Sequence, residues 1–164
     1  GLRPDAGQPP GGRPAEGWLT VAVLGLPLSV YRVVEEHNDA LMREFAMIAK
    51  RPDAPGAPRR LVELVEEARA RFPQEAESSR SQVEAAVEAG ESSVDVELVV
   101  PVAARGMIIR LVELLDEADA FCEQGELLTL ASPPEVRRLR SWFLDQVLRQ
   151  LDGLPAERWP WPED

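Results

Sequence analysis

Two prolines, Pro27 and Pro101, each separate a short run of strand-forming residues from a long segment with helical periodicity. Residues 18–26 are rich in Val and Leu, and residues 93–100 alternate apolar with polar side chains before they become wholly apolar. Each run therefore predicts a strand that closes at the proline. Because these strands are few and short, helices must cover them, which predicts an α+β fold.

Apolar side chains recur at intervals of three and four residues along five segments, which is the period of an amphipathic helix. Pro and Gly residues separate these segments. Residues 127–131 are a shorter apolar run that fits either a third strand or an extended connector. The prediction is a predominantly helical α+β domain, with about five helices packed on a sheet of two or three strands. The expected helices cover residues 30–50, 59–72, 74–89, 102–123 and 133–151.

Two local signals predict where helices begin. Ser29 follows Pro27 and is placed to act as an N-cap. Ser132 and Glu135 have the spacing of a capping box, with Pro at the first helical position. We therefore expect the Ser132 hydroxyl to accept a hydrogen bond from a backbone N–H of the helix. We also expect the Glu135 carboxylate to accept one from the backbone N–H of Ser132.

The chain has 164 residues, of which 45% are hydrophobic, and this size suits one domain with a single core. We expect that domain to cover residues 18–153. Residues 1–17 are rich in Pro and Gly and predict a flexible tail rather than a signal peptide. Residues 154–164 predict an extended arm that carries Trp159 and Trp161 between prolines.

Charge and cysteine content exclude several classes of protein. Lys and Arg total 18 and Asp and Glu total 29, so the net charge is −11, which disfavours binding to nucleic acid or to anionic membranes. No stretch approaches the roughly 20 apolar residues of a membrane-spanning helix. Cys122 is the only cysteine, so an internal disulfide is excluded and a cytoplasmic location is expected.

One internal similarity stands out. Residues 60–68 and residues 110–118 are identical at seven of nine positions. The strand–proline–helix order also occurs twice, around Pro27 and around Pro101. Two explanations fit these observations: the use of the same helix-forming residues in unrelated helices, and an ancient duplication. The sequence leaves the choice open.

Side chains that could carry chemistry are scattered. Glu113 and Glu117 lie one turn apart, but no histidine accompanies them, so a solvated acidic stripe is the simpler interpretation. His37 is the only histidine, and it and Cys122 are expected to be packed side chains. Phosphate-binding and dinucleotide-binding glycine motifs are absent from the sequence. We predict no metal, no cofactor and no catalytic residue.

The competing hypothesis is a small enzyme or ligand-binding domain. Its polar pocket would lie between the helices of residues 30–50 and 102–123. Convergence of these polar side chains around a cavity would distinguish it from a protein-binding domain. The candidate pocket residues are His37, Arg43, Glu44, Asp116, Asp119 and Cys122.

A second group of residues suggests protein contacts. The last long helix is more basic than the rest of the chain, and its guanidinium groups suit either an acidic partner or the acidic helices of the chain itself. Two tryptophans on the arm are costly to leave in water, so we expect the arm to dock on the same or a neighbouring chain. The candidate contact residues are Arg137, Arg138, Arg140, Trp142, Trp159 and Trp161.

Residues 36–45 read EHNDALMREF, residues 114–122 read LLDEADAFC, and residues 126–135 read ELLTLASPPE. With their surroundings, these segments resemble a set of small, uncharacterised proteins of high-GC bacteria. Those proteins are encoded with partner-switching regulators: STAS-type antagonists, anti-sigma ATP-binding kinases and PP2C-like phosphatases. The resemblance covers most of residues 18–161 and implies a signalling neighbourhood rather than a reaction.

The chain does not resemble the kinase or the antagonist of such a system. The kinase fold needs Glu-x-x-x-Asn and Asp-x-Gly-x-Gly, whereas Glu35 and Asn38 are three residues apart and the second motif is absent. Three consecutive middle helices do not fit the alternating pattern of a STAS domain. We therefore expect a non-enzymatic, cytoplasmic regulatory or adaptor protein that binds protein partners, with a homodimer as one option.

Overall fold

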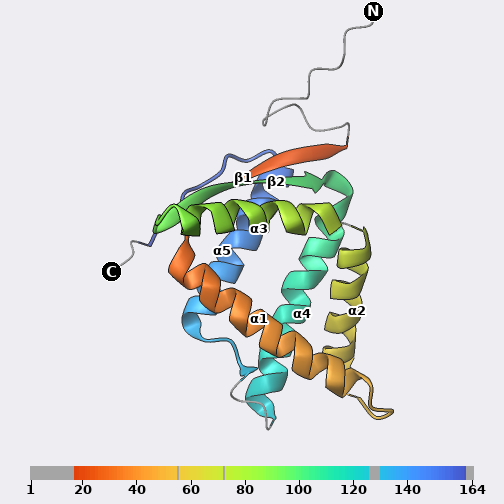
Figure 1. Cartoon of the computed structure of the whole chain (residues 1–164). Coiled ribbons are helices and arrows are strands. Elements are labelled where there is room, and N and C mark those ends of the chain that lie inside the picture. The colour runs from red at the N-terminus through yellow and green to blue at the C-terminus, as the bar shows by residue number, and fades with distance from the viewer. Residues whose placement is uncertain (1–16, 55, 72, 126–129, 162–164) are drawn as a thin grey trace, which may run out of the picture.

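Five α-helices and two strands make up the described part of the chain (Figure 1). The structure is a computed structural model and describes residues 17–54, 56–71, 73–125 and 130–161. The predicted class, α+β and predominantly helical, is confirmed. The elements are β1 (Trp18–Pro27), α1 (Leu28–Ala49), α2 (Gly56–Arg71), α3 (Pro73–Glu88), β2 (Ser93–Pro101), the short 3-10 helix η1 (Val102–Ala104), α4 (Arg105–Gln124) and α5 (Pro134–Leu151).

The sheet consists of β1 and β2, paired antiparallel. A bulge interrupts the pairing between Val23 and Leu26. Gly25 lies in this bulge with φ +72°, a conformation that favours glycine, and its N–H donates to Asp95 Oδ1 at 2.8 Å. As for the suggested third strand, Leu130 and Ala131 lie outside any strand, and residues 127–129, like the predicted tail up to residue 16, lie outside the described residues.

Each end of the sheet is closed by a backbone hydrogen bond of the same kind, from the residue after the proline. The N–H of Leu28, just after Pro27, donates to the carbonyl of Ser92 at 3.0 Å. The N–H of Val102, just after Pro101, donates to the carbonyl of Gly17 at 2.9 Å. The strand–proline–helix unit therefore repeats in backbone geometry as well as in sequence.

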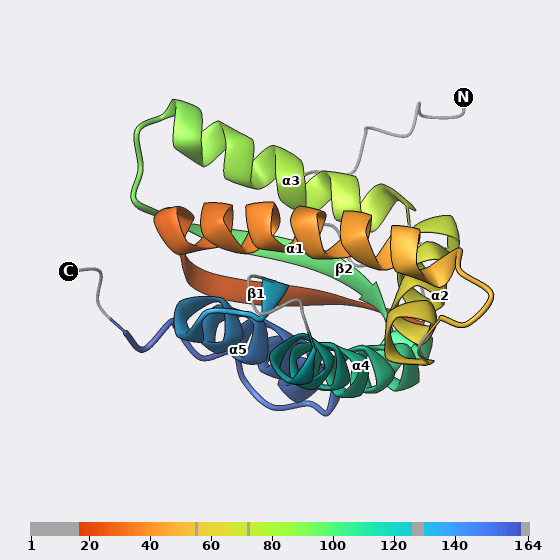
Figure 2. The ribbon, with the colours of Figure 1, turned by 90° about the horizontal axis from the view of Figure 1, so that it is seen from below.

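Both outer edges of the sheet are covered by a glutamine side chain. On the β1 edge, the Gln150 amide accepts from Ala22 N at 2.9 Å and donates to Ala22 O at 2.7 Å. On the β2 edge, the Gln82 amide makes the same pair of bonds to Glu97, each at 2.8 Å. Ala22 and Glu97 lie opposite each other across the sheet, and their backbone groups point outward, so α5 and α3 cover the two edges at the same level. Figure 2 shows these two helices on opposite sides of the strand pair.

The core has two parts. One lies under the sheet, where Val23 and Val96 pack against Leu139 of α5. The other lies among α1, α2 and α4, where the fully buried Phe45 contacts Phe121 edge-on with ring centres 5.8 Å apart. Within the residues that the structure describes, no helix is long and apolar enough to cross a membrane.

Both predicted side-chain caps are wrong. Helix α1 begins at Leu28 with Pro27 as its N-cap, because the Leu28 N–H already has the Ser92 carbonyl as a partner, and Ser29 lies inside the first turn. Helix α5 has Pro133 as its N-cap and no side-chain cap bond. Since proline has no N–H, the two prolines leave fewer donors to satisfy at this helix start.

Candidate functional site

A buried polar cluster links α1, α4, α5 and the loop before α5. We call Asp119, Arg140, Ser132 and His37 the Asp119 cluster. The Arg140 guanidinium donates to Asp119 Oδ2 at 2.6 Å and to Ser132 Oγ at 3.1 Å. Asp119 Oδ1 accepts from the Ser132 N–H at 3.0 Å, and Ser132 Oγ lies 3.1 Å from His37 Nε2. The Ser132 hydroxyl is therefore committed here, which is why it does not cap α5.

Burial and hydrogen bonding set the protonation states in this cluster. Burial raises the pKa of Asp119, but the hydrogen bonds from Ser132 and Arg140 outweigh burial, so the pKa lies below its usual value and the group is a carboxylate. Burial lowers the pKa of His37, with Asp119 opposing and Arg140 adding to that shift, which keeps the ring neutral near pH 7. Burial raises the pKa of the nearby Cys122 thiol to about 11, so this cysteine is not activated as a nucleophile.

The polar-pocket residues come together only in part. His37 and Asp119 share the cluster described above, and Cys122 is buried in the adjoining helical core. Asp116 is 74% exposed and lies 3.8 Å from the Arg140 guanidinium. Arg43 and Glu44 are exposed on α1.

A cavity does lie between α1 and α4, with α5 as its third wall, but none of the six pocket residues lines it. We call it the α1–α4–α5 cavity. Its volume is about 200 Å³. Its lining is apolar and aromatic except for Asn38 and Arg140, and the Asn38 Oδ1 atom is buried without a hydrogen-bond partner among the described residues. The lining residues are Tyr31, Val34, Asn38, Leu111, Leu115, Leu139, Arg140, Phe143 and Leu144.

The C-terminal arm docks on the chain's own body. The Trp159 N–H donates to the Leu24 carbonyl of β1 at 2.9 Å. Its ring stacks edge-on against the buried Trp142, with ring centres 5.0 Å apart, and Trp161 packs on Trp159 at 4.7 Å. The predicted docking of the arm is confirmed, and the body it docks on is that of the same chain.

The arginines of α5 also have partners within the chain. Arg137 bonds Glu123 and the Ser132 carbonyl, and Arg140 is paired with Asp119. Arg138 lies over the Trp161 ring, 5.1 Å from its centre. Of the two options for this basic side, the structure therefore shows the intramolecular one.

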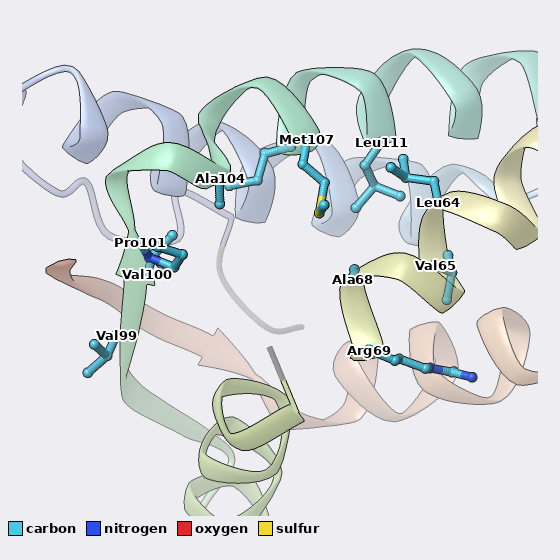
Figure 3. A pocket seen from close by; sticks show the side chains of 11 residues that line it. Leu64, Val65, Ala68, Arg69, Val99, Val100, Pro101, Ala104, Met107 and Leu111 are labelled. Carbon is cyan, nitrogen blue, oxygen red and sulfur yellow. The ribbon is translucent and has the colours of Figure 1, made fainter. Parts of the chain in front are cut away.

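An apolar groove runs between α2 and α4 and is closed at one end by the last residues of β2 (Figure 3). Its volume is about 340 Å³. Met107 and Leu111 point from α4 toward the space that Ala68 faces from α2, while the Arg69 guanidinium points away from it. We call this the α2–α4 groove. The described lining residues are Leu64, Val65, Ala68, Arg69, Val99, Val100, Pro101, Ala104, Met107, Ile108 and Leu111.

Two valines near the end of β2 are exposed. Val99, at its edge, is 43% exposed, and Val102, just after Pro101, is 49% exposed. Sequence reasoning missed the groove because its apolar lining residues look like ordinary core residues of their own helix or strand. The signal that could have found it is the apolar end of β2, where two consecutive valines precede a proline and a third valine follows it.

The described residues contain no group of three or more His, Cys, Asp or Glu side chains placed to hold a metal ion. No family model, no curated protein and no solved structure matches the chain.

Proposed function

We propose that this chain is a non-enzymatic regulatory or adaptor protein that acts by binding a partner protein, and that the α2–α4 groove is its docking surface. The groove carries the proposal. It is open at the surface, its lining has one charged residue among those described, and Val99 at its edge is 43% exposed. Apolar surface gathered in this way marks interaction sites on soluble domains.

The groove and the net charge together define the partner's chemistry. Because the lining is apolar, the part of the partner that is buried must also be apolar. Because the chain carries a net charge of −11, a segment flanked by Lys and Arg is attracted during approach. The proposed occupant is therefore an apolar segment with basic flanks on a different protein.

The Asp119 cluster supports a structural role for the polar side chains. Ser132 is 5% exposed, and its hydroxyl is shared by His37 and Arg140. Asp119 accepts from Arg140 and from the backbone instead of orienting the histidine. A nucleophile needs an accessible hydroxyl and a base that a third group aligns, and this arrangement provides neither.

The setting of this function is also a proposal. The resemblance to proteins encoded beside partner-switching regulators suggests a bacterial, cytoplasmic signalling system. Its components would then be the first partners to test.

The test is capture of interacting proteins with the full chain and with two variants. Met107→Glu places a charge in the groove, whereas Met47→Glu makes the same change at a residue of α1 that is 65% exposed. We expect Met107→Glu to lose one captured protein that the unchanged chain and Met47→Glu retain. A photo-crosslinker at position 108 should then join that protein through a segment rich in apolar and basic residues.

Three outcomes would overturn the proposal. The first is equal capture by all three chains. The second is a crosslink to a second copy of the chain, with a change of oligomeric state in Met107→Glu, which would make the groove a homodimer interface. The third is a crosslink to a small molecule.

One observation favours a second candidate function, a small ligand-binding domain. An apolar cavity of about 200 Å³ lies among α1, α4 and α5, and small-molecule sites are concave and mostly apolar.

A further inference from the structure

The C-terminal arm meets β1 at the bulge. Leu24 and Gly25 are left out of the pairing between β1 and β2. The Leu24 carbonyl instead accepts from the Trp159 N–H of the arm at 2.9 Å. This bond lies on the edge of β1 that Gln150 covers at Ala22, so the arm continues the cover of that edge in the manner of an added strand.

Three side chains of α5 also hold the arm, and their spacing of four and three residues places them on one face of the helix. The Gln146 Oε1 atom accepts from the Glu157 N–H at 2.7 Å, and the Arg149 guanidinium donates to the Glu157 carboxylate at 2.9 Å. The Trp142 ring packs edge-on against that of Trp159. The arm is thus recognised by two backbone N–H groups, one carboxylate and one aromatic ring. We call Leu24, Trp142, Gln146 and Arg149 the arm seat.

The turn that joins α5 to the docked residues, 152–155, is exposed. The chain reverses at Gly153, where φ is +84°, and the Leu154 N–H donates to the Arg149 carbonyl at 2.9 Å. The bonds between the arm and its seat begin only at Glu157 and do not involve this turn. An arm that arrives from another copy can therefore make the same bonds, once the turn at Gly153 opens.

The arm is held incompletely. Gln146 Nε2 and Arg149 Nε are buried without hydrogen-bond partners among the described residues, although both groups bond Glu157 through another atom. A buried donor without an acceptor has lost its hydration without a replacement. The bonds from Arg158 to Asp95 are both 3.3 Å long and exposed, so they add little. Release of the arm from its own chain is therefore inexpensive.

A second copy of the chain supplies both an arm and an arm seat. A released arm exposes Trp159, and an empty seat exposes Trp142, and both rings are costly to leave in water. Exchange of two arms restores every bond on both copies, which makes it a low-cost route to a dimer. The net charge of −11 on each copy opposes association, and salt screens this repulsion.

We propose that two copies of this chain exchange their arms, each placing residues 157–161 in the arm seat of the other, in equilibrium with the monomer. The exchanged dimer forms as the protein concentration rises, and salt favours it. The turn at Gly153 opposes it, because an intact turn keeps the arm at a high effective concentration beside its own seat.

The test measures the monomer–dimer equilibrium of the full chain by sedimentation, against a variant that lacks residues 154–156. Gln146 lies about two turns before Gly153, roughly 10 Å along the helix at 1.5 Å per residue. In the shortened chain Glu157 follows Gly153 directly and cannot reach its own Gln146. We expect the dissociation constant of the dimer to fall by about a hundredfold or more, because the chain's own arm no longer competes.

Three controls identify the contact. Replacing residues 154–156 by Gly-Ser-Gly keeps the length of the turn, so its dissociation constant should stay close to that of the unchanged chain. In the shortened chain, Trp159→Ala should restore the monomer, whereas Met107→Glu, in the α2–α4 groove, should leave the dimer intact. In a dimer of one isotope-labelled and one unlabelled unchanged copy, a filtered NOE should join Trp142 of one copy to Trp159 of the other.

The proposal is overturned if the unchanged chain stays monomeric up to its solubility limit in both low and high salt, a result that does not depend on folding of the shortened chain. It is also overturned if a folded shortened chain stays monomeric, or if Trp159→Ala leaves its dimer in place. Dissociation by Met107→Glu would assign the dimer to the groove instead. Capture of a protein partner does not enter these measurements, so arm exchange and groove docking fail independently.

Discussion

Asp119 and Arg140 form an ion pair in which both side chains are at most 9% exposed. Removing one member of such a pair leaves the other charge buried and uncompensated. We predict that Asp119→Ala destabilises the fold by about 3–5 kcal/mol in urea unfolding. Asp116→Ala, which removes the exposed and more distant carboxylate near Arg140, should cost less than about 1 kcal/mol. Equal losses of stability for the two substitutions would show that the buried ion pair matters no more to stability than the exposed carboxylate does.

His37 makes stability depend on pH. Its pKa in the folded chain is lowered by burial, so the unfolded chain binds the proton more readily. The free energy of unfolding should therefore reach its full value at pH values above 6.5, and it should decrease as the pH falls below 6.5. His37→Gln should flatten this part of the profile, measured by urea unfolding between pH 7.5 and 5.5. An unchanged slope in the variant would contradict the assignment.

At the scale of elements, two glutamines take the place of neighbouring strands. Gln150→Leu removes both bonds to Ala22, whose N–H and C=O are part-buried. We expect a loss of about 1–3 kcal/mol, because both groups lose their partner. Gln82→Leu acts on the exposed edge, where water replaces the amide, so its loss should be smaller. Chemical unfolding of both variants gives the comparison, and a larger loss for Gln82→Leu would contradict this explanation.

The arm is the second feature at this scale. Trp159→Ala removes the edge-on contact with Trp142 and the packing on Trp161. The ring pair with Trp142 alone is worth roughly 0.5–1.5 kcal/mol, and burial adds to it. We predict lower stability together with a change in tryptophan fluorescence, both measured during urea unfolding. Trp161→Ala, at a residue that is 40% exposed, is the milder control, and an arm detached in solution would make both substitutions neutral.

The secondary structure was largely predictable, because the positions of Pro and Gly and the spacing of apolar residues are local signals. Both strands, both prolines that close them and the five helices follow from these signals alone. The helix caps were not predictable, because the choice between capping and bonding to His37 depends on where α1 passes Ser132. A serine before two prolines and a glutamate has the same local pattern in either case.

The candidate sites show the same division between local and tertiary information. The α1–α4 neighbourhood was predicted as a pocket, but the residues chosen for it were those with titratable side chains. The structure places those side chains in the Asp119 cluster, in the helical core or in solvent, while the cavity is lined by apolar and aromatic residues with Asn38 and Arg140. Identifying the lining requires knowing which faces of three helices fail to fill the space between them, and that depends on packing.

For the whole molecule, the central claim is that the α2–α4 groove receives an apolar segment of another protein. Hydrogen–deuterium exchange of the chain, alone and with its captured partner, tests this claim most directly. The account predicts slower exchange on binding within residues 64–71 and 99–111, with α5 and the arm unchanged. Protection confined to residues 137–161, with the groove unaffected, would contradict it.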